Sequence, residues 1–212
     1  MYLYLVQEMS PVYEKLGFAV RANWLVDMAF RRLISFNRQD KHRDTPYILI
    51  IEDLKSSLTV KGARDVGLEK LVEYDTTVNK TKREPFVRHW AYERNDSVCK
   101  ISFALPQIEC DSKTNLYLKR TRPVALCPIY ADSDDAFVAL FKALALCYEE
   151  ELKENNRIDI RSPSTKTPRI KQLLSEVAQI TVKSQCTPQF TKYVPEHDIE
   201  KIYSITDMTF FI

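Results

Sequence analysis

The stretch that most constrains the fold is residues 134–153, with the sequence DDAFVALFKALALCYEEELK. Between Ala136 and Tyr148 it holds a single charged side chain, Lys142. A helix that is apolar on nearly every side has to be covered on most of them. The stretch is also too short to cross a bilayer, which takes about 20 apolar residues. We therefore predict a central buried helix in a soluble domain, with the other segments packed around it.

Length and glycine content limit what this helix can belong to. The 212 residues suit one domain, and we predict a single domain over 1–212 with a linker-like segment at 161–168, RSPSTKTP. Glycine occurs only at Gly17, Gly62 and Gly67. Loops that cradle phosphates need several glycines close together. A standard dinucleotide site and a P-loop are therefore excluded.

Two further patterns predict the rest of the architecture. Val20, Trp24 and Met28 recur at a spacing of four, which favours a long N-terminal helix over about 12–36. Residue types alternate along 86–94 and again along 98–105, on either side of Asn95-Asp96-Ser97. This pattern predicts an antiparallel hairpin at about 86–105. We therefore expect an α+β (or mixed α/β) fold, with a mixed sheet packed on the central helix.

Cysteine usage bears on the cellular compartment. The five cysteines are widely spaced, without a Cys-x-x-Cys motif, and three of them lie in apolar runs. This distribution is typical of free thiols in a reducing environment. The first residues lack the basic and long apolar regions of a signal peptide. We expect an intracellular protein, nuclear or cytoplasmic, without a membrane partner.

One motif suggests catalysis. Asp53-x-Lys55 follows the apolar run 47–51, and Glu52 lies beside it. This motif resembles the metal-dependent nucleases of the PD-(D/E)xK type. The resemblance implies that Asp53 holds Mg²⁺, that Lys55 steadies the attacking water, and that Asp40 or Asp44 supplies a second acid. The alternative, which we favour, is a solvated turn after a core strand. Only under the nuclease hypothesis do we expect a cofactor, Mg²⁺.

Basic and aromatic residues suggest nucleic-acid binding. In a strand, Arg88, Trp90, Tyr92 and Arg94 would share one face, where bases could stack on rings while cations meet phosphates. The alternative is that the rings pack under a neighbouring helix and the arginine stems cover apolar surface. The candidate nucleic-acid-binding residues are Lys82, Arg83, Arg88, Trp90, Tyr92, Arg94, Lys119, Arg120 and Arg122.

The sequence lacks a nucleophile motif and the ligand spacing of a zinc site, and its three histidines are isolated from one another. Our first hypothesis is a non-catalytic subunit or adaptor of a larger intracellular assembly, with protein partners and a connection to nucleic acid. The second is direct binding of DNA or RNA through the basic and aromatic residues. The third is the metal-dependent nuclease.

Overall fold

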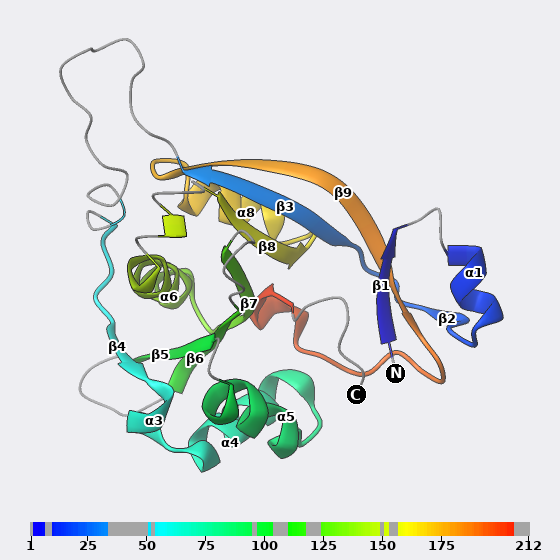
Figure 1. Ribbon diagram of the computed structural model, residues 1–212, viewed down its shortest axis with the longest axis horizontal. Helices are drawn as coiled ribbons and strands as arrows, with labels where there is room; N and C mark the ends of the chain where they lie inside the picture. Colours follow the sequence, from blue (N-terminus) through cyan, green and yellow to red (C-terminus); the bar gives the residue numbers. More distant parts are fainter. Residues whose placement is uncertain are drawn as a thin grey trace, which may run out of the picture.

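The computed structural model describes residues 2–6, 10–33, 51, 54–94, 97–103, 110–117, 124–148, 151–152 and 157–205. The described strands join in one mixed sheet with helices packed against it (Figure 1). The prediction of a single α+β domain with a mixed sheet is therefore confirmed. The strands are β1 (Tyr2–Val6), β2 (Val20–Arg21), β3 (Val26–Leu33), β4 (Thr59–Gly62), β5 (Ser97–Phe103), β6 (Cys110–Tyr117), β7 (Val124–Ala131), β8 (Arg157–Pro163), β9 (Ala178–Phe190) and β10 (Ile202–Ser204).

Several short helices and one long apolar helix accompany the sheet. Gly67, with a φ of 92°, separates the first two helices of the middle of the chain. The helices are α1 (Ser10–Lys15), α3 (Ala63–Val66), α4 (Leu68–Asn79), α5 (Glu84–Arg88), the π-helical turn His89–Glu93, α6 (Asp134–Cys147), α8 (Thr167–Leu173) and the 3₁₀ turn Ile199–Lys201. No described helix is both long enough and apolar enough to cross a membrane.

The strand order is β1-β9-β3-β8-β7-β6-β5-β4, with β2 added on β9 and β10 on β7. Among the described strand pairs, β7 and β8 form the parallel pair. Their register joins Val124 to Ile158 and Ala125 to Asp159. Further along, β10 pairs with β7, and the Ile205 N–H donates to the Arg161 carbonyl of β8 at 2.8 Å. The segment around β10 thus lies beside both strands where their own pairing ends (Figure 1).

The prediction of a central buried helix is confirmed by α6. Ser133 caps its first turn by accepting a hydrogen bond from the Ala136 N–H at 3.2 Å. Phe137, Leu140 and Phe141 are fully buried, in a cluster that includes side chains of β7, β8 and α8. The apolar run of the helix is therefore covered, as its composition requires.

Helix α4 builds a second part of the core. Its Tyr74 and Val78 pack with Tyr130 of β7 and with Ile202 and Ile205 around β10. Figure 1 shows α4 and α5 on the side of β5 and β6 opposite α6. The end of β7 is therefore held between α4 and the segment that carries β10.

The long helix expected over 12–36 is wrong. The helix ends at Lys15, Gly17 has a φ of 92°, and the chain continues as β2 and β3. Residues four apart share a face in a helix, but they also share a face in a strand, where the period is two. Here Trp24 lies at the bend between β2 and β3 and Met28 lies in β3, and both pack against one core cluster.

The hairpin expected at about 86–105 is also wrong in its first half. Residues 84–93 form α5 and the π-helical turn, and β5 pairs instead with β4 and β6. Pro85 lies in the first turn of α5, where its missing N–H costs no hydrogen bond. Phe86 and Trp90 then lie one turn apart, with ring centroids separated by 5.9 Å.

The linker-like segment 161–168 is part of the fold as well. Its first residues belong to β8 and its last two to α8. Ser162 and Thr167 are buried, and their hydroxyl oxygens lie 3.1 Å apart. Hydroxyl residues that suggested a solvated linker therefore satisfy each other inside the protein.

Candidate ligand pocket

A pocket of about 550 Å³ lies where the end of β7 meets the α4–α5 connection and the chain between β9 and β10. Its walls combine aromatic and aliphatic side chains with a few polar ones, the usual composition of small-molecule sites. We call it the β7 pocket. Its lining residues are Trp24, Asn79, Thr81, Lys82, Arg83, Pro85, Phe86, Tyr130, Phe190, Thr191, Lys192, Tyr193, Pro195, His197, Ile202 and Ile205.

The polar wall of the β7 pocket is built around Arg83. Helix α4 ends at Asn79, and Lys80 takes the left-handed conformation with a φ of 53°, which turns the chain back along the helix. Arg83 thereby reaches Asp75 with two hydrogen bonds, Nε to Oδ2 at 3.0 Å and Nη2 to Oδ1 at 2.8 Å. The same Nη2 lies 3.3 Å from the Tyr130 hydroxyl, and the guanidinium stacks over the Phe86 ring. Arg83 is therefore fixed in one orientation at the wall.

His197 is the second polar group of this wall. The backbone N–H of the next residue, Asp198, donates to the Val78 carbonyl at 2.8 Å and ties this segment to α4. Burial, with a smaller contribution from the positive charge of Arg83, lowers the pKa of His197 to about 4. Its Nδ1 is buried and has no hydrogen-bond partner among the described residues. His197 is therefore a neutral imidazole at neutral pH, and its buried Nδ1 is not satisfied by any described residue.

The charges around the β7 pocket are all positive. Lys82, Arg83 and Lys192 line it, and no acidic side chain does so among the described residues. Asp75 lies behind Arg83 and neutralises it, and Lys82 lies 3.4 Å from Glu84 at the surface. No ion pair joins Lys192 to another residue in the described part of the chain. Lys192 is thus the cation most available to a bound molecule.

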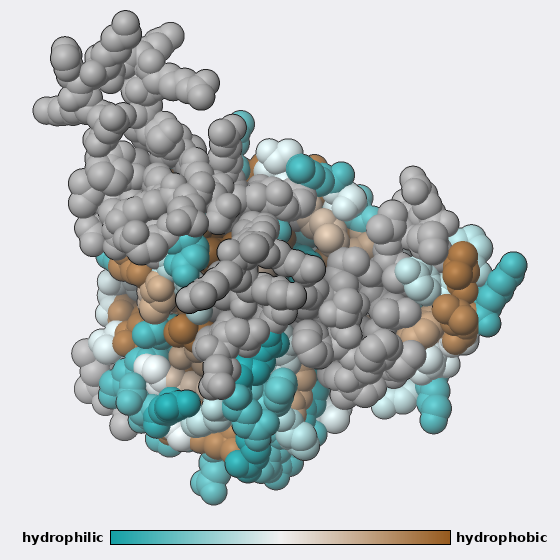
Figure 2. Space-filling view, viewed as in Figure 1, coloured by the Kyte–Doolittle hydropathy of each residue, from teal (hydrophilic) through white to brown (hydrophobic). Residues whose placement is uncertain are grey.

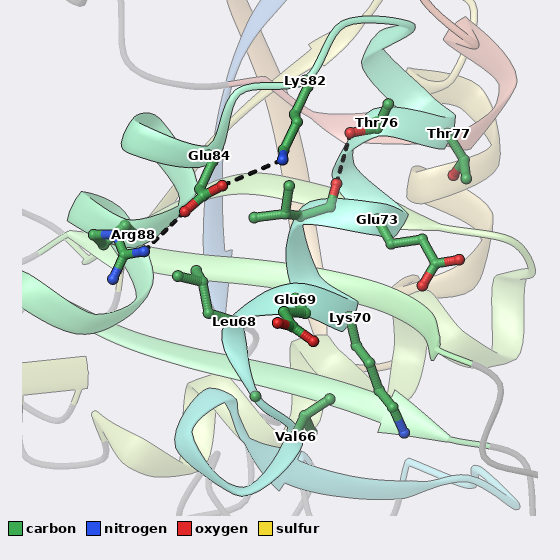
Figure 3. A pocket seen from close by; sticks show the side chains of 12 residues that line it. Val66, Leu68, Glu69, Lys70, Glu73, Thr76, Thr77, Lys82, Glu84 and Arg88 are labelled. Carbon is green, nitrogen blue, oxygen red and sulfur yellow. Dashed lines mark hydrogen bonds and ion pairs between the residues drawn. The ribbon is translucent and has the colours of Figure 1, made fainter.

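A second, larger hollow of about 960 Å³ lies along α4 and α5 (Figure 3). Its charges pair among themselves: Lys82 and Arg88 both contact Glu84, at 3.4 and 2.8 Å. The other charged lining residues, Glu69, Lys70 and Glu73, come from α4. Because acids and bases balance there, this hollow gives less basis for choosing a ligand than the β7 pocket does.

Exposed apolar side chains are few over the described surface. Val12 of α1 and Leu16, just after this helix, lie four residues apart, and Leu25 and Tyr193 are separate from them in the sequence. Figure 2 shows the brown area over α1, and elsewhere on this face hydrophobic and hydrophilic residues alternate over the coloured surface. Tyr193, which is 70% exposed, lies at the β7 pocket.

The structure separates the predicted nucleic-acid-binding residues. Lys82 and Arg83 line the β7 pocket, whereas Arg88 faces Glu84 on α5. Trp90 is only 1% exposed and Arg94 stacks over its ring at 4.3 Å, so this ring is not open to a base. The other predicted positions are Tyr92, whose hydroxyl donates to the Ala63 carbonyl, and Lys119, Arg120 and Arg122, which lie outside the described residues.

The predicted nuclease residues are described only in part. Lys55 is exposed, and Asp44, Glu52 and Asp53 lie outside the described residues. Within the described ranges, no group of three metal-ligating side chains comes together. Sequence reasoning also missed His197, Asp75 and Tyr130, because a turn after α4 and the chain after β9 bring them together without any local motif.

No protein-family model and no curated protein matches the sequence. Solved structures do resemble its fold. A provisionally assigned acetyltransferase of Pyrococcus horikoshii superposes with a TM-score of 0.60 at 11% identity, over 98% of this chain and 58% of that one. A conserved Staphylococcus epidermidis protein of unknown function gives 0.54 at 6% identity, over 87% and 67%. A GCN5-related N-acetyltransferase of Anabaena variabilis gives 0.51 at 10% identity, over 89% and 44%.

These similarities correct the functional expectation. The hypothesis of a non-catalytic adaptor or complex subunit is wrong, and so is the expected connection to nucleic acid, because the neighbours that carry a function are acetyltransferases. At these identities the similarity concerns the fold. The chain spans 58% and 44% of the lengths of the two acetyltransferases. Its described part has the mixed α/β fold of the GCN5-related N-acetyltransferases.

Proposed function

We propose that this protein takes part in N-acyl transfer and that the β7 pocket binds the acyl acceptor, a small molecule with a primary amine. The fold supports this assignment, because two neighbours with TM-scores above 0.5 are described as acetyltransferases. The main support for the proposal is the composition of the β7 pocket. Basic side chains and the neutral His197 line it, and no acidic residue does so among the described residues.

This charge pattern suits the chemistry of an acceptor amine. An amine attacks a carbonyl carbon only when it is neutral, because its lone pair must be free. Nearby positive charges lower the pKa of a bound amine, since they disfavour its ammonium form. Lys192 supplies such a charge at the pocket. His197 lines the same pocket as a neutral imidazole, so it brings no negative charge that would favour the ammonium form of the amine.

The acyl donor used by enzymes of this fold is acyl-CoA, and the chain does not fit its phosphates at the expected place. In open α/β sheets a ligand binds where a parallel strand pair opens, near the following helix N-terminus. Here that place is the β7–α6 turn, which has no glycine and carries Asp132, Asp134 and Asp135. These acids already bind the nearby donors: Asp132 pairs with Lys201, Asp134 pairs with Arg169, and Asp135 accepts from the Ser57 hydroxyl. None of these donors is therefore left to bind a phosphate. We therefore assign the acceptor, and not acyl-CoA, to this chain.

The test is a thiol-release assay with two acyl thioesters and a panel of small primary amines. One thioester is acetyl-CoA, and the other is S-acetyl-N-acetylcysteamine, which has no phosphate. We expect amine-dependent thiol release that does not depend on the CoA phosphates, together with an N-acetylated product seen by mass spectrometry. The absence of N-acetylated product with either thioester and every amine would overturn the proposal.

Variants connect the assay to the pocket. Replacing His197 by Ala removes the buried ring nitrogen, and we expect acetylation to fall by about tenfold or more, within the range that a positioned polar group contributes. Lys70→Ala is the control, because Lys70 is an exposed lysine of α4 outside the β7 pocket. Equal losses in both variants would remove the pocket from the reaction.

A further inference from the structure

The geometry points to a more specific ligand: we infer that the β7 pocket selects small carboxylates with an aromatic or bulky apolar body, so that the acceptor is an amine that also carries a carboxylate. This inference rests on the proposed function for the role of the amine, but the recognition of the carboxylate can be tested without it. Three features of the pocket support the inference: the charge of its walls, their apolar surface, and the position of the available cation.

The first feature is the charge of the pocket walls. Three basic residues and no acidic residue line the pocket within the described part of the chain. Arg83 is paired with Asp75, and Lys82 lies 3.4 Å from Glu84, so the positive charge that remains at the pocket is that of Lys192. A ligand that is only a cation would meet repulsion without any compensating acid. A ligand with a carboxylate gains attraction and brings its own counter-charge.

The second feature is shape. Aromatic rings line the pocket at Trp24, Phe86, Tyr130, Phe190 and Tyr193, and Ile202 and Ile205 add aliphatic surface. A volume of about 550 Å³ is within the range of pockets that enclose a small organic molecule. Burying apolar surface is worth about 25 cal/mol per Å². A bare amino acid such as glycine would leave most of this surface unused, whereas a phenyl-sized group would use it.

The third feature is the position of Lys192. It lies two residues after Phe190 and next to Tyr193, so a cation and two rings of the pocket come from one short segment. His197 follows on the same stretch of chain and lines the pocket as a neutral imidazole. A carboxylate at Lys192 and an apolar group against the rings would leave an amine free to lie near His197.

The test compares four ligands by isothermal titration calorimetry with the whole chain at pH 7.5. 3-Phenylpropanoate has the carboxylate and the ring, phenethylamine has the amine and the ring, phenylalanine has all three, and glycine lacks the ring. We expect 3-phenylpropanoate and phenylalanine to bind at least tenfold more tightly than phenethylamine and glycine. Phenethylamine binding as tightly as 3-phenylpropanoate, or no binding by either carboxylate with a ring, would overturn the inference.

A charge reversal locates the carboxylate. Lys192→Glu turns the attraction into repulsion, and we expect the affinity for 3-phenylpropanoate to fall by at least tenfold while phenethylamine binds no more weakly than before. Lys70→Glu makes the same change of charge outside the pocket and should alter neither. Both lysines are exposed, so circular dichroism should be unchanged. An unaltered affinity in Lys192→Glu would contradict the inference.

The two proposals fail in different ways. If phenylalanine binds with the expected preference but is never N-acetylated by either thioester, the carboxylate site stands and N-acyl transfer fails. If amines without a carboxylate are acetylated and bind as well as phenylalanine, N-acyl transfer stands and the carboxylate preference fails. Binding and product formation are therefore measured on the same preparation.

Discussion

Arg83 and Asp75 form a buried ion pair behind the β7 pocket, with 2.8 Å between Nη2 and Oδ1 and side chains that are 9% and 2% exposed. The pair joins the α4–α5 connection to the helix it follows. Because Nη2 also lies 3.3 Å from the Tyr130 hydroxyl, it links this connection to β7 as well. The wall of the pocket thus depends on a charge pair that water hardly reaches.

Removing one partner of this pair should be costly. Asp75→Ala leaves the Arg83 guanidinium buried without its counter-charge, and breaking a buried pair in this way costs about 3–5 kcal/mol of unfolding free energy. Urea unfolding followed by circular dichroism measures the change. The double variant Asp75→Ala, Arg83→Met removes both charges, so its loss should be smaller than that of Asp75→Ala alone.

A matched exposed pair provides the control. Lys82 and Glu84 lie 3.4 Å apart with side chains 70% and 38% exposed. Solvent-exposed pairs contribute little to stability, so Lys82→Ala, which leaves the Glu84–Arg88 pair in place, should cost far less than Asp75→Ala. Similar losses for the two variants would mean that the Arg83–Asp75 pair is not as buried as the structure has it.

His197 predicts a pH dependence of stability. Burial lowers its pKa to about 4 in the folded protein, from the ordinary histidine value of 6.5. Between these values the unfolded chain binds a proton that the folded chain does not, so the unfolding free energy rises with pH. The contribution is fully present above pH 6.5 and is lost as the pH falls to about 4, a change of about 3 kcal/mol at most.

The measurement is urea unfolding at pH values from about 7 down to 4. His197→Asn removes the titrating ring and should flatten the profile in that window. His89→Asn is the control, because His89 is exposed and lies outside the pocket. A profile that flattens equally in both variants, or in neither, would contradict the buried neutral state of His197.

The sequence predicted best where composition alone was decisive. An apolar run such as 136–148 must be buried whatever surrounds it, and α6 is buried. The spacing of four between Val20, Trp24 and Met28 was ambiguous, because it is compatible with both a helix and a strand. The opposite error occurred at Phe86 and Trp90. Alternating residue types predicted a strand there, but the two residues lie one helical turn apart.

The β7 pocket could be predicted only in fragments. Lys82 and Arg83 were recognised as basic candidates from the sequence, but their roles differ, because Arg83 is neutralised by Asp75 eight positions earlier. That contact depends on the left-handed conformation of Lys80. Glycine would have indicated such a turn in the sequence, but a lysine occupies this position. His197 is brought to the same wall by the chain after β9, more than a hundred residues away. Distant contacts of this kind leave no local pattern.

The cysteines should differ in reactivity. Cys147, at the end of α6, is exposed, whereas Cys99, Cys127 and Cys186 are buried. Burial also raises the pKa of the Cys186 thiol to about 11, which leaves very little thiolate at neutral pH. Brief alkylation of the native protein followed by peptide mapping should therefore modify Cys147 well before these three. Fast labelling at Cys186 would contradict the packing of β9 against β3.

Tyr203 of β10 tests how firmly the segment beside β7 and β8 is held. Its hydroxyl donates to Asp134 Oδ1 at 2.7 Å, and its ring stacks on Phe137 with 4.6 Å between centroids. Tyr203→Phe keeps the stacked ring and removes a hydrogen bond to a charged group, which should cost about 1.5–3 kcal/mol. Arg169 still pairs with Asp134 in this variant, which favours the lower end of that range.

Truncation of the ring should cost more, because Tyr203→Ala also opens a cavity against Phe137; aromatic-to-alanine changes in cores cost about 3–5 kcal/mol. Tyr193→Phe is the control, since Tyr193 is 70% exposed and surface changes usually stay within about 0.5 kcal/mol. Urea unfolding of the three variants at pH 7 ranks them. If Tyr203→Ala were no worse than Tyr193→Phe, β10 would not be part of the folded core, and the space beside β7 and β8 would be open to a ligand.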